Sequence, residues 1–200
     1  MIIYATKQTV DRYGIRMPDE FENPRVRALA HSTYERERGD GLLEWGAKLF
    51  YFDRRKCIQF CNFASKLTVI LADIKKNELK FAPNAIAENL FNIYSDDKKM
   101  TALLERFFAE HPIACYSKLT DRSIISTLNR TQSDYLYDGY RLYDFIEDNI
   151  LHTLKLNKVI NKENPVSKNV NGKREYFFPA EEFAALLKAR YAPGKGRLFM

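Results

Sequence analysis

Three short apolar runs stand close together in the first half of the chain, with short polar breaks between them. Residues 48–52, 57–63 and 67–72 are rich in aromatic and β-branched side chains. This pattern is typical of antiparallel strands that follow one another as a meander. We therefore predict a central sheet over about residues 46–72. Neither face of the first run is consistently polar, which indicates that other elements cover both faces of the sheet.

Other apolar patterns predict the elements around this sheet. Short apolar runs at residues 1–6 and near 113–117 predict two further strands. Apolar residues at helical spacing predict helices at 25–38, 83–94, 98–111 and 121–129, one or two more within 134–162, and a last one at 180–191. Thr120 is expected to cap the helix that follows it, and Val26 and Leu29 to belong to a buried stripe. The fold class that follows is α+β, with a mainly antiparallel sheet packed by helices.

The pair Asn171-Gly172 predicts a hairpin late in the chain. Both central residues of a type I′ turn take positive φ, which Asn-Gly tolerates best. In that register Lys168 faces Glu175 across the two strands. We therefore divide the chain into an α+β core at 1–140 and a basic extension at 141–200, in which a helix, a hairpin and a helix pack on the core.

Composition indicates a folded domain inside the cell. A chain of 200 residues buries roughly 70% of its unfolded surface, so it needs neither disulfides nor metal to fold. No apolar run approaches the roughly 18 residues that cross a membrane, and the first residues lack the pattern of a signal peptide. We expect a cytoplasmic protein. Its cysteines, Cys57, Cys61 and Cys115, lie in apolar runs and are expected to be buried free thiols.

The net charge of +6 is unevenly distributed along the chain. Residues 155–200 carry ten Lys or Arg against four Glu, which accounts for the whole excess. Three more cations occupy the predicted turn after the first meander strand. Such groups attract nucleic acid or an acidic partner, although an ordinary solvated surface has the same composition. The candidate nucleic-acid-binding residues are Arg54, Arg55, Lys56, Lys155, Lys158, Lys162, Lys168, Lys173 and Arg174.

The common motifs of enzymes are missing from the sequence. It has no phosphate-binding loop, no dinucleotide fingerprint, no nucleophile elbow and no zinc-protease motif. The three histidines, His31, His111 and His152, lie far apart and do not combine with cysteines at the spacing of a zinc site. We expect no metal and no cofactor, and catalytic activity stays an open question.

Polar residues share one face of the helix predicted from residue 121. Arg122, Ser126 and Asn129 follow one another at helical spacing, opposite the apolar stripe. Such a face can hydrogen-bond a ligand, and it can equally be a solvated helix surface. One hypothesis is a pocket for an anionic group beside the meander, lined by Asn62, Ser65, Arg122 and Asn129.

Three segments together carry a resemblance to a known family: IIYATK, EWGAKLFYFDRRKCIQFCNFASKLTVIL and SKLTDRSIISTLNRTQSDYL. They resemble an uncharacterised bacterial domain family that is related to domains attached to plasmid pRiA4b ORF-3-like proteins and transposon passenger proteins. The resemblance covers 1–140 and implies the fold. The related domains are attached to proteins of mobile elements, which points to nucleic acid by association only. The residues that match the family pattern are Thr6, Lys7, Trp45, Asn62, Ser65, Arg122, Ser123, Asn129 and Asp134. The candidate ligand-binding residues are Thr6, Lys7, Trp45, Asn62, Ser65, Arg122, Ser126 and Asn129.

Three functions are compatible with these patterns. The preferred one is a non-enzymatic binding module for nucleic acid or an acidic partner, linked to mobile elements or phage defence. The second is a small-ligand binder or enzyme that uses the polar pocket. The third is a homo-oligomeric interaction protein, whose interface would be an exposed edge of the meander or a tyrosine-rich stretch. Its candidate residues are Tyr135, Tyr137, Tyr140 and Tyr143, for which core packing is the more usual fate.

Overall fold

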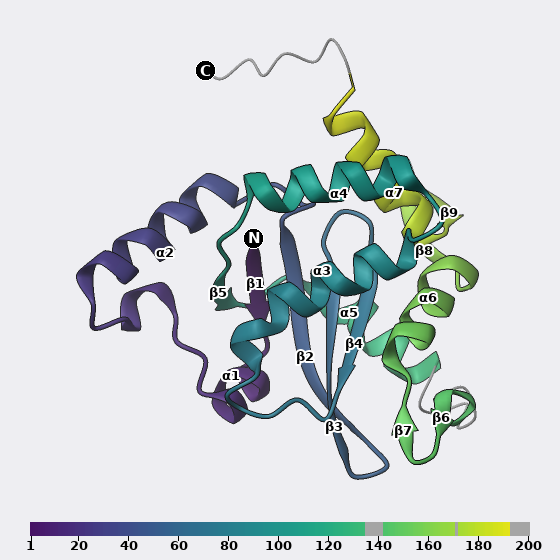
Figure 1. Cartoon of the computed structure of the whole chain (residues 1–200), viewed down its shortest axis with the longest axis horizontal. Coiled ribbons are helices and arrows are strands. Elements are labelled where there is room, and N and C mark those ends of the chain that lie inside the picture. Colours follow the sequence, from purple (N-terminus) through teal and green to yellow (C-terminus); the bar gives the residue numbers. More distant parts are fainter. Residues whose placement is uncertain (135–141, 171, 193–200) are drawn as a thin grey trace.

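The fold is built on a five-stranded mixed sheet (Figure 1). The computed structural model describes residues 1–134, 142–170 and 172–192. The strands lie in the order β4-β3-β2-β1-β5; their bounds are β1 Ile2–Ala5, β2 Glu44–Phe52, β3 Arg55–Asn62, β4 Thr68–Ala72 and β5 Cys115–Lys118. The predicted meander is the antiparallel set β2, β3 and β4, and β1 pairs in parallel with both β2 and β5. The predicted α+β class with a mainly antiparallel sheet is confirmed.

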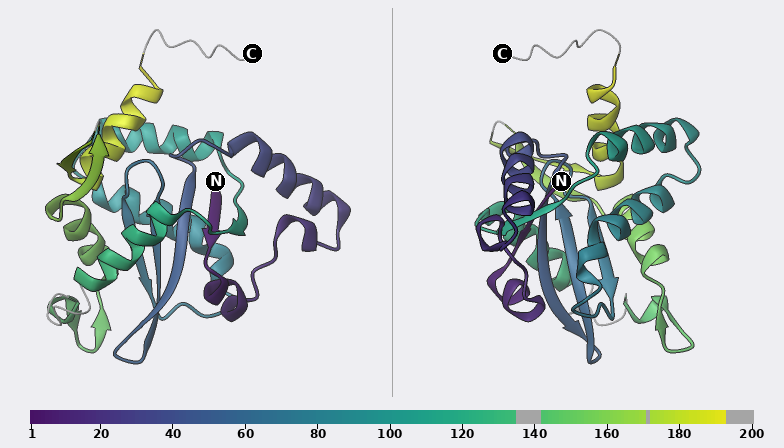
Figure 2. Two further views of the ribbon diagram at one scale, coloured as in Figure 1. Left: turned by 180° about the vertical axis from the view of Figure 1, so that it is seen from behind. Right: turned by 60° about the vertical axis from the view of Figure 1, so that its left-hand side comes forward.

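Helices cover both faces of this sheet, as Figure 1 and the reverse view in Figure 2 show. Their bounds are α1 Lys7–Tyr13, α2 Pro24–Glu37, α3 Ala82–Ile93, α4 Lys98–Glu110, α5 Arg122–Gln132, α6 Thr153–Glu163 and α7 Pro179–Arg190. Helices α3, α4 and α7 enclose the largest core cluster, in which Trp45, Phe60, Phe107 and Phe183 are fully buried. Helices α5 and α6 pack on the other face, so both faces are buried as predicted.

Gly46 lets α5 approach β2 closely. A Cβ atom at this position would lie 2.3 Å from Cγ2 of Ile124, a buried side chain of α5. We predict that Gly46→Ala destabilises the fold by about 1–3 kcal/mol, because the helix must move to relieve the overlap. Urea denaturation measures this loss. If the close approach is the cause, Ile124→Ala should remove most of the extra loss in a double-mutant cycle; strictly additive effects would contradict it.

Helix α6 closes the free edge of β4 with two asparagine side chains. Asn157 accepts a hydrogen bond from Ile70 N at 2.8 Å and donates to Ile70 O at 2.9 Å. Asn161 pairs in the same way with Thr68, at 2.7 and 2.6 Å. Four residues along a helix rise about 6 Å, which is close to the repeat of two residues along a strand. The two amides therefore continue the sheet where no further strand follows.

Several local predictions are wrong, for identifiable reasons. Asp121 caps α5, with its carboxylate accepting from Ile124 N at 2.8 Å, so the cap is not Thr120. Val26 and Leu29 are 42% and 49% exposed, because α2 turns a neighbouring side of the helix toward the sheet.

One or two helices are predicted within residues 134–162; α6 is one of them, a short hairpin precedes it, and residues 135–141, with Tyr135, Tyr137 and Tyr140, lie outside the described residues. The hairpin consists of β6 Ile146–Glu147 and β7 Ile150–Leu151, after a single 3₁₀ turn, Tyr143–Phe145. Asp148 and Asn149 form its turn with positive φ, a conformation that Asp and Asn tolerate better than other residues with a Cβ.

The late hairpin forms in the predicted register. Its strands are β8 Val166–Val170 and β9 Lys173–Phe177, with Lys168 opposite Glu175. The Lys168 ammonium, however, lies 2.9 Å from Glu182 of α7. Gly172 has φ 80°, and Asn171 lies outside the described residues. The division of the chain at residue 140 stays a prediction.

The three cysteines are buried, as predicted. Cys57, Cys61 and Cys115 are free and buried. Burial raises the pKa of the first two thiols to about 12 and that of the third to about 11, so they stay protonated and inert at neutral pH. Within the described ranges, none of the helices has both the length and the apolar character required to cross a bilayer.

Candidate anion-binding cleft

A surface cleft of about 460 Å³ opens where α1, the β2–β3 turn and the loop after β4 meet. Five cations line it: Arg12, Arg54, Lys56, Lys75 and Lys76. The other lining residues are Tyr13, Asp73 and Ile74. The cleft therefore gathers basic side chains from three segments that are far apart in the sequence.

The α1 wall is fixed to the loop after β4. The buried Tyr13 hydroxyl donates to Ile74 O at 3.2 Å. Gly14 ends α1 in the left-handed conformation that a glycine adopts without strain. A Cβ there would lie 2.9 Å from Nζ of Lys76, so this lysine lies directly against the end of the helix. The left-handed φ explains why a glycine follows α1, and the absence of a Cβ leaves room for the end of the Lys76 side chain.

The β2–β3 turn supplies two of the cations. Asp53 and Arg54 both have positive φ, 45° and 63°, which is the geometry of a type I′ hairpin turn. Arg54 and Lys56 line the cleft, whereas Arg55, which lies between them, points elsewhere. Its guanidinium binds Asp73 at 2.8 Å and also the side chain of Asn149. Of the three cations predicted at this turn, two therefore reach the cleft and one holds the β6–β7 hairpin.

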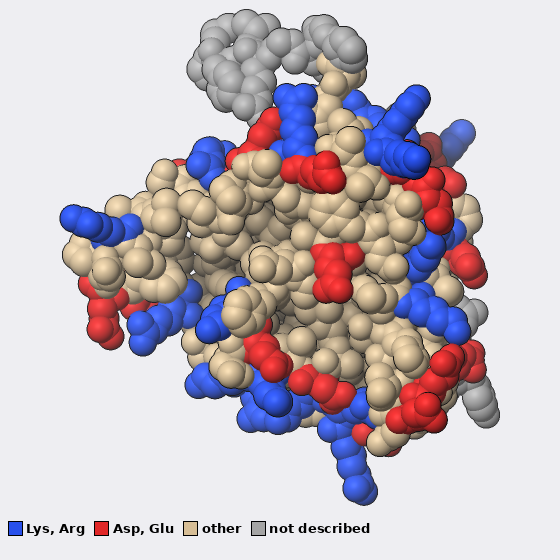
Figure 3. Space-filling view, viewed as in Figure 1, with Lys and Arg blue, Asp and Glu red and all other residues tan. Residues whose placement is uncertain are grey.

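The charge of the cleft is not neutralised from within. Asp73 is its single acidic lining residue, and Arg55 already pairs with it. Over the described parts of the chain, none of the five lining cations forms an ion pair. Figure 3 shows basic side chains gathered along the lower edge of the molecule, where Figure 1 places α1 and the β2–β3 turn. A concave surface with unpaired cations attracts anionic ligands.

The cations of the C-terminal quarter are arranged differently. Several are paired with acidic residues: Lys155 with Glu147, Lys158 with Asp96, Lys168 with Glu182, Lys188 with Asp97 and Arg190 with Asp40. In Figure 3, acidic and basic side chains lie side by side over α7 and the β8–β9 hairpin. Lys162, Lys173 and Arg174 are exposed. The described cations of this segment thus do not collect in one patch on this face.

Two predicted ligand residues, Asn62 and Ser65, are buried in the β3–β4 turn. Asn62 Nδ2 donates to three backbone carbonyls, those of residues 41, 42 and 44, at 3.0–3.2 Å. Its Oδ1 accepts from both the backbone N and the hydroxyl of Ser65. The Ser65 hydroxyl in turn accepts from Leu67 N. These hydrogen bonds give the polar atoms of both side chains partners within the protein. The Asn-x-x-Ser pattern therefore stabilises the β3–β4 turn.

The polar face of α5 lies at the surface. Arg122 and Ser126 are exposed, and Asn129 accepts from Lys48 Nζ at 2.6 Å. Four clefts of about 390–620 Å³ are described, and none of these four is lined by Asn62, Ser65 or a residue of α5.

The other predicted ligand residues lie near the parallel strands. The Thr6 hydroxyl contacts that of Thr9, which accepts from Leu49 N where β1 ends. Trp45 is buried, and Lys7 is exposed. Neither of these two lines one of the four clefts, so the ligand-binding role of the three residues stays a prediction.

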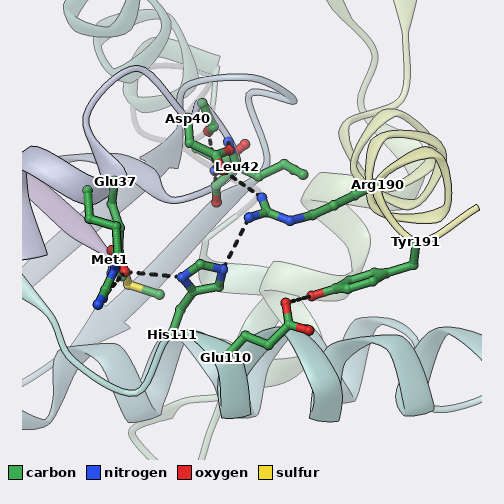
Figure 4. Close-up of polar contacts among 11 residues, drawn as sticks. Met1, Glu37, Asp40, Leu42, Glu110, His111, Arg190 and Tyr191 are labelled. Carbon is green, nitrogen blue, oxygen red and sulfur yellow. Dashed lines mark hydrogen bonds and ion pairs between the residues drawn. The ribbon is translucent and has the colours of Figure 1, made fainter. Parts of the chain in front are cut away.

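A buried charged network, which the sequence analysis did not find, joins α2, α4 and α7 (Figure 4). The Glu37 carboxylate binds the amino group of Met1 and accepts from Nδ1 of His111 at 3.1 Å. Arg190 lies 3.1 Å from Nε2 of the same imidazole and 2.7 Å from Asp40. A guanidinium can only donate, so the His111 proton resides on Nδ1. The contacting pairs of this network are 36 to 150 positions apart in the sequence, so no local spacing predicts the contacts.

Comparison with known proteins places the chain in a family. No curated protein matches it. Residues 2–182 match the family described as Domain of unknown function (DUF6933), which extends the resemblance beyond residue 140 to include α6, the β8–β9 hairpin and the start of α7. The match shows no link to plasmid pRiA4b ORF-3-like proteins. The chain therefore belongs to the DUF6933 domain family over nearly its whole length.

Proposed function

We propose that this protein is a non-enzymatic binding module that holds the phosphate groups of nucleic acid in the basic cleft. The observation that carries the proposal is the convergence of Arg12, Arg54, Lys56, Lys75 and Lys76 on one cleft without an ion pair to any of them among the described residues. Phosphate groups are bound by such clusters of Lys and Arg, and the binding releases counterions from the nucleic acid.

The geometry suits an extended anion better than a small one. The five cations come from three separate walls, so their charges are spread around the cleft rather than focused on one point. Four of them, Arg12, Arg54, Lys75 and Lys76, are exposed at the surface. A chain of phosphates can contact several of them in succession.

The test is the salt dependence of binding to a labelled oligonucleotide. For single strands, the slope of log K against log salt changes by about 0.7 for each phosphate that a cation neutralises. We predict that the double variant Lys75→Gln/Lys76→Gln weakens binding at low salt and reduces the slope by about 1.4. Fluorescence anisotropy over a series of salt concentrations measures both effects.

The control is the pair Lys98→Gln/Lys99→Gln at the start of α4, which removes the same charge from two exposed lysines outside the cleft. We expect this control variant to keep most of the slope of log K against log salt. If both double variants lose the same slope, or if the unaltered protein does not bind oligonucleotides at low salt, the proposed function is wrong.

A further inference from the structure

An exposed aromatic ring lies beside the basic cleft. Tyr51 is 52% exposed, although it belongs to an otherwise well-buried strand and precedes the last residue of that strand. It faces Lys56 in the β2–β3 register, so the two side chains are neighbours on one face of the sheet. Lys56 lines the cleft.

The electrostatics of Tyr13 relate this ring to the α1 wall. Burial raises the pKa of the Tyr13 hydroxyl, the positive charge of Arg12 opposes this effect, and the nearby Tyr51 adds to it. Arg12 and Tyr51 are therefore both within electrostatic range of Tyr13, and Arg12 and Tyr13 line the cleft. The ring is therefore the cross-strand neighbour of Lys56, and Lys56 lines the same cleft as Arg12.

We infer that the cleft binds single-stranded nucleic acid, with one base stacked on Tyr51 and the adjoining phosphates on Arg12, Arg54 and Lys56. This inference rests on the proposed function and narrows it. An unpaired strand offers a free base face next to each phosphate, and base–aromatic stacking combined with a cationic groove is how single strands are bound without sequence preference. A duplex keeps its base faces inside the stack, so it can use the cations but not the ring. An acidic protein segment offers charge and no base.

The experiment compares four probes of equal length by anisotropy: oligothymidylate of about 12 nucleotides, its duplex, its abasic analogue and polyglutamate as a competitor. We expect the single strand to bind more tightly than the duplex and the abasic strand. Tyr51→Ala should weaken single-strand binding by roughly 5- to 100-fold and leave abasic binding unchanged, whereas Tyr51→Phe keeps the ring and should bind like the unaltered protein. The matched control is Tyr176→Ala, which removes a tyrosine that is 62% exposed on the β8–β9 hairpin.

The outcomes separate this inference from the proposed function. Salt-dependent binding that Lys75→Gln/Lys76→Gln weakens, but Tyr51→Ala does not, overturns the stacking role alone. Duplex binding as tight as single-strand binding overturns it too. Polyglutamate that competes as well as oligothymidylate of equal charge would make an acidic protein the partner and overturn both.

Discussion

Replacing Asn157 with alanine is expected to lower the free energy of unfolding by about 3–4 kcal/mol, a large share of the stability of a domain this size. The side chain is fully buried, and its loss leaves the N–H and C=O of Ile70 without partners. It also removes the donor to Asn89 Oδ1 at 2.7 Å. Each buried polar group left unpaired costs about 1–3 kcal/mol. Urea denaturation gives the loss, and amide exchange at Ile70 shows whether the edge of β4 has opened.

Asn92→Ala is the matched control. Its amide donates one bond, to Leu154 O at 3.0 Å, at an exposed position where water can replace it. We expect a loss below about 1 kcal/mol. Asn157→Leu separates hydrogen bonding from volume, because it fills the site without pairing with the strand; it should be destabilised as well. A variant with leucine as stable as the unaltered protein would show that packing, not pairing, holds α6 on β4.

Glu37→Gln is expected to cost about 3 kcal/mol at neutral pH and to change how stability depends on acid. Burial raises the pKa of Glu37, but hydrogen bonds from His111, the amino group of Met1 and Arg36 outweigh it and hold the pKa at about 2, below the ordinary 4.5. A carboxyl with a lowered pKa stabilises the fold above its unfolded pKa. Its contribution is therefore complete above about pH 4.5 and disappears as the pH falls toward 2.

The comparison is a set of denaturation curves between pH 7 and pH 2 for both proteins. The free energy of unfolding of the unaltered protein should fall as the pH falls from 7 to 2. That of Glu37→Gln should be lower at pH 7 and should fall less. Glu35→Gln serves as the control, since its side chain is 66% exposed and its nearest cation, Arg38, is 3.9 Å away. We expect the control to change stability by less than about 1 kcal/mol. Parallel pH curves for Glu37→Gln and the unaltered protein would contradict the ionised, buried carboxylate.

Most of the fold could be predicted because its signals are local. The meander, the helices α3, α4 and α7, and the hairpin register follow from apolar spacing and from turn residues such as Gly172. Prediction from local spacing fails where a segment is short and its residues fit either a helix or a hairpin. Residues 143–151 are apolar enough to suggest a helix, yet the Asp148-Asn149 turn closes a hairpin there. The parallel position of β1 between β2 and β5 depends on contacts across more than 40 residues, which no periodicity reports.

The candidate site was only partly predictable for the same reason. The cations of the β2–β3 turn stand together in the sequence, and two of them reach the cleft. Arg12, Lys75 and Lys76 join them only through the packing of α1 against the loop after β4. The cluster of charge at residues 155–200 was the stronger sequence signal, but ion pairs with acids from distant segments, such as Asp96 and Asp40, divide it. The two asparagines that stand four residues apart on α6 are a further signal in the sequence, because they share the face of the helix that pairs with β4.

The most direct test of the account is to map where an oligonucleotide binds. Amide chemical shifts of the labelled protein are recorded as oligothymidylate is added at low salt. We predict shifts that are concentrated at residues 12–14, 51–56 and 73–76, the three walls of the cleft and the ring beside them. Shifts confined to the β8–β9 hairpin around Lys173 and Arg174, or no shifts at saturating oligonucleotide, would contradict it.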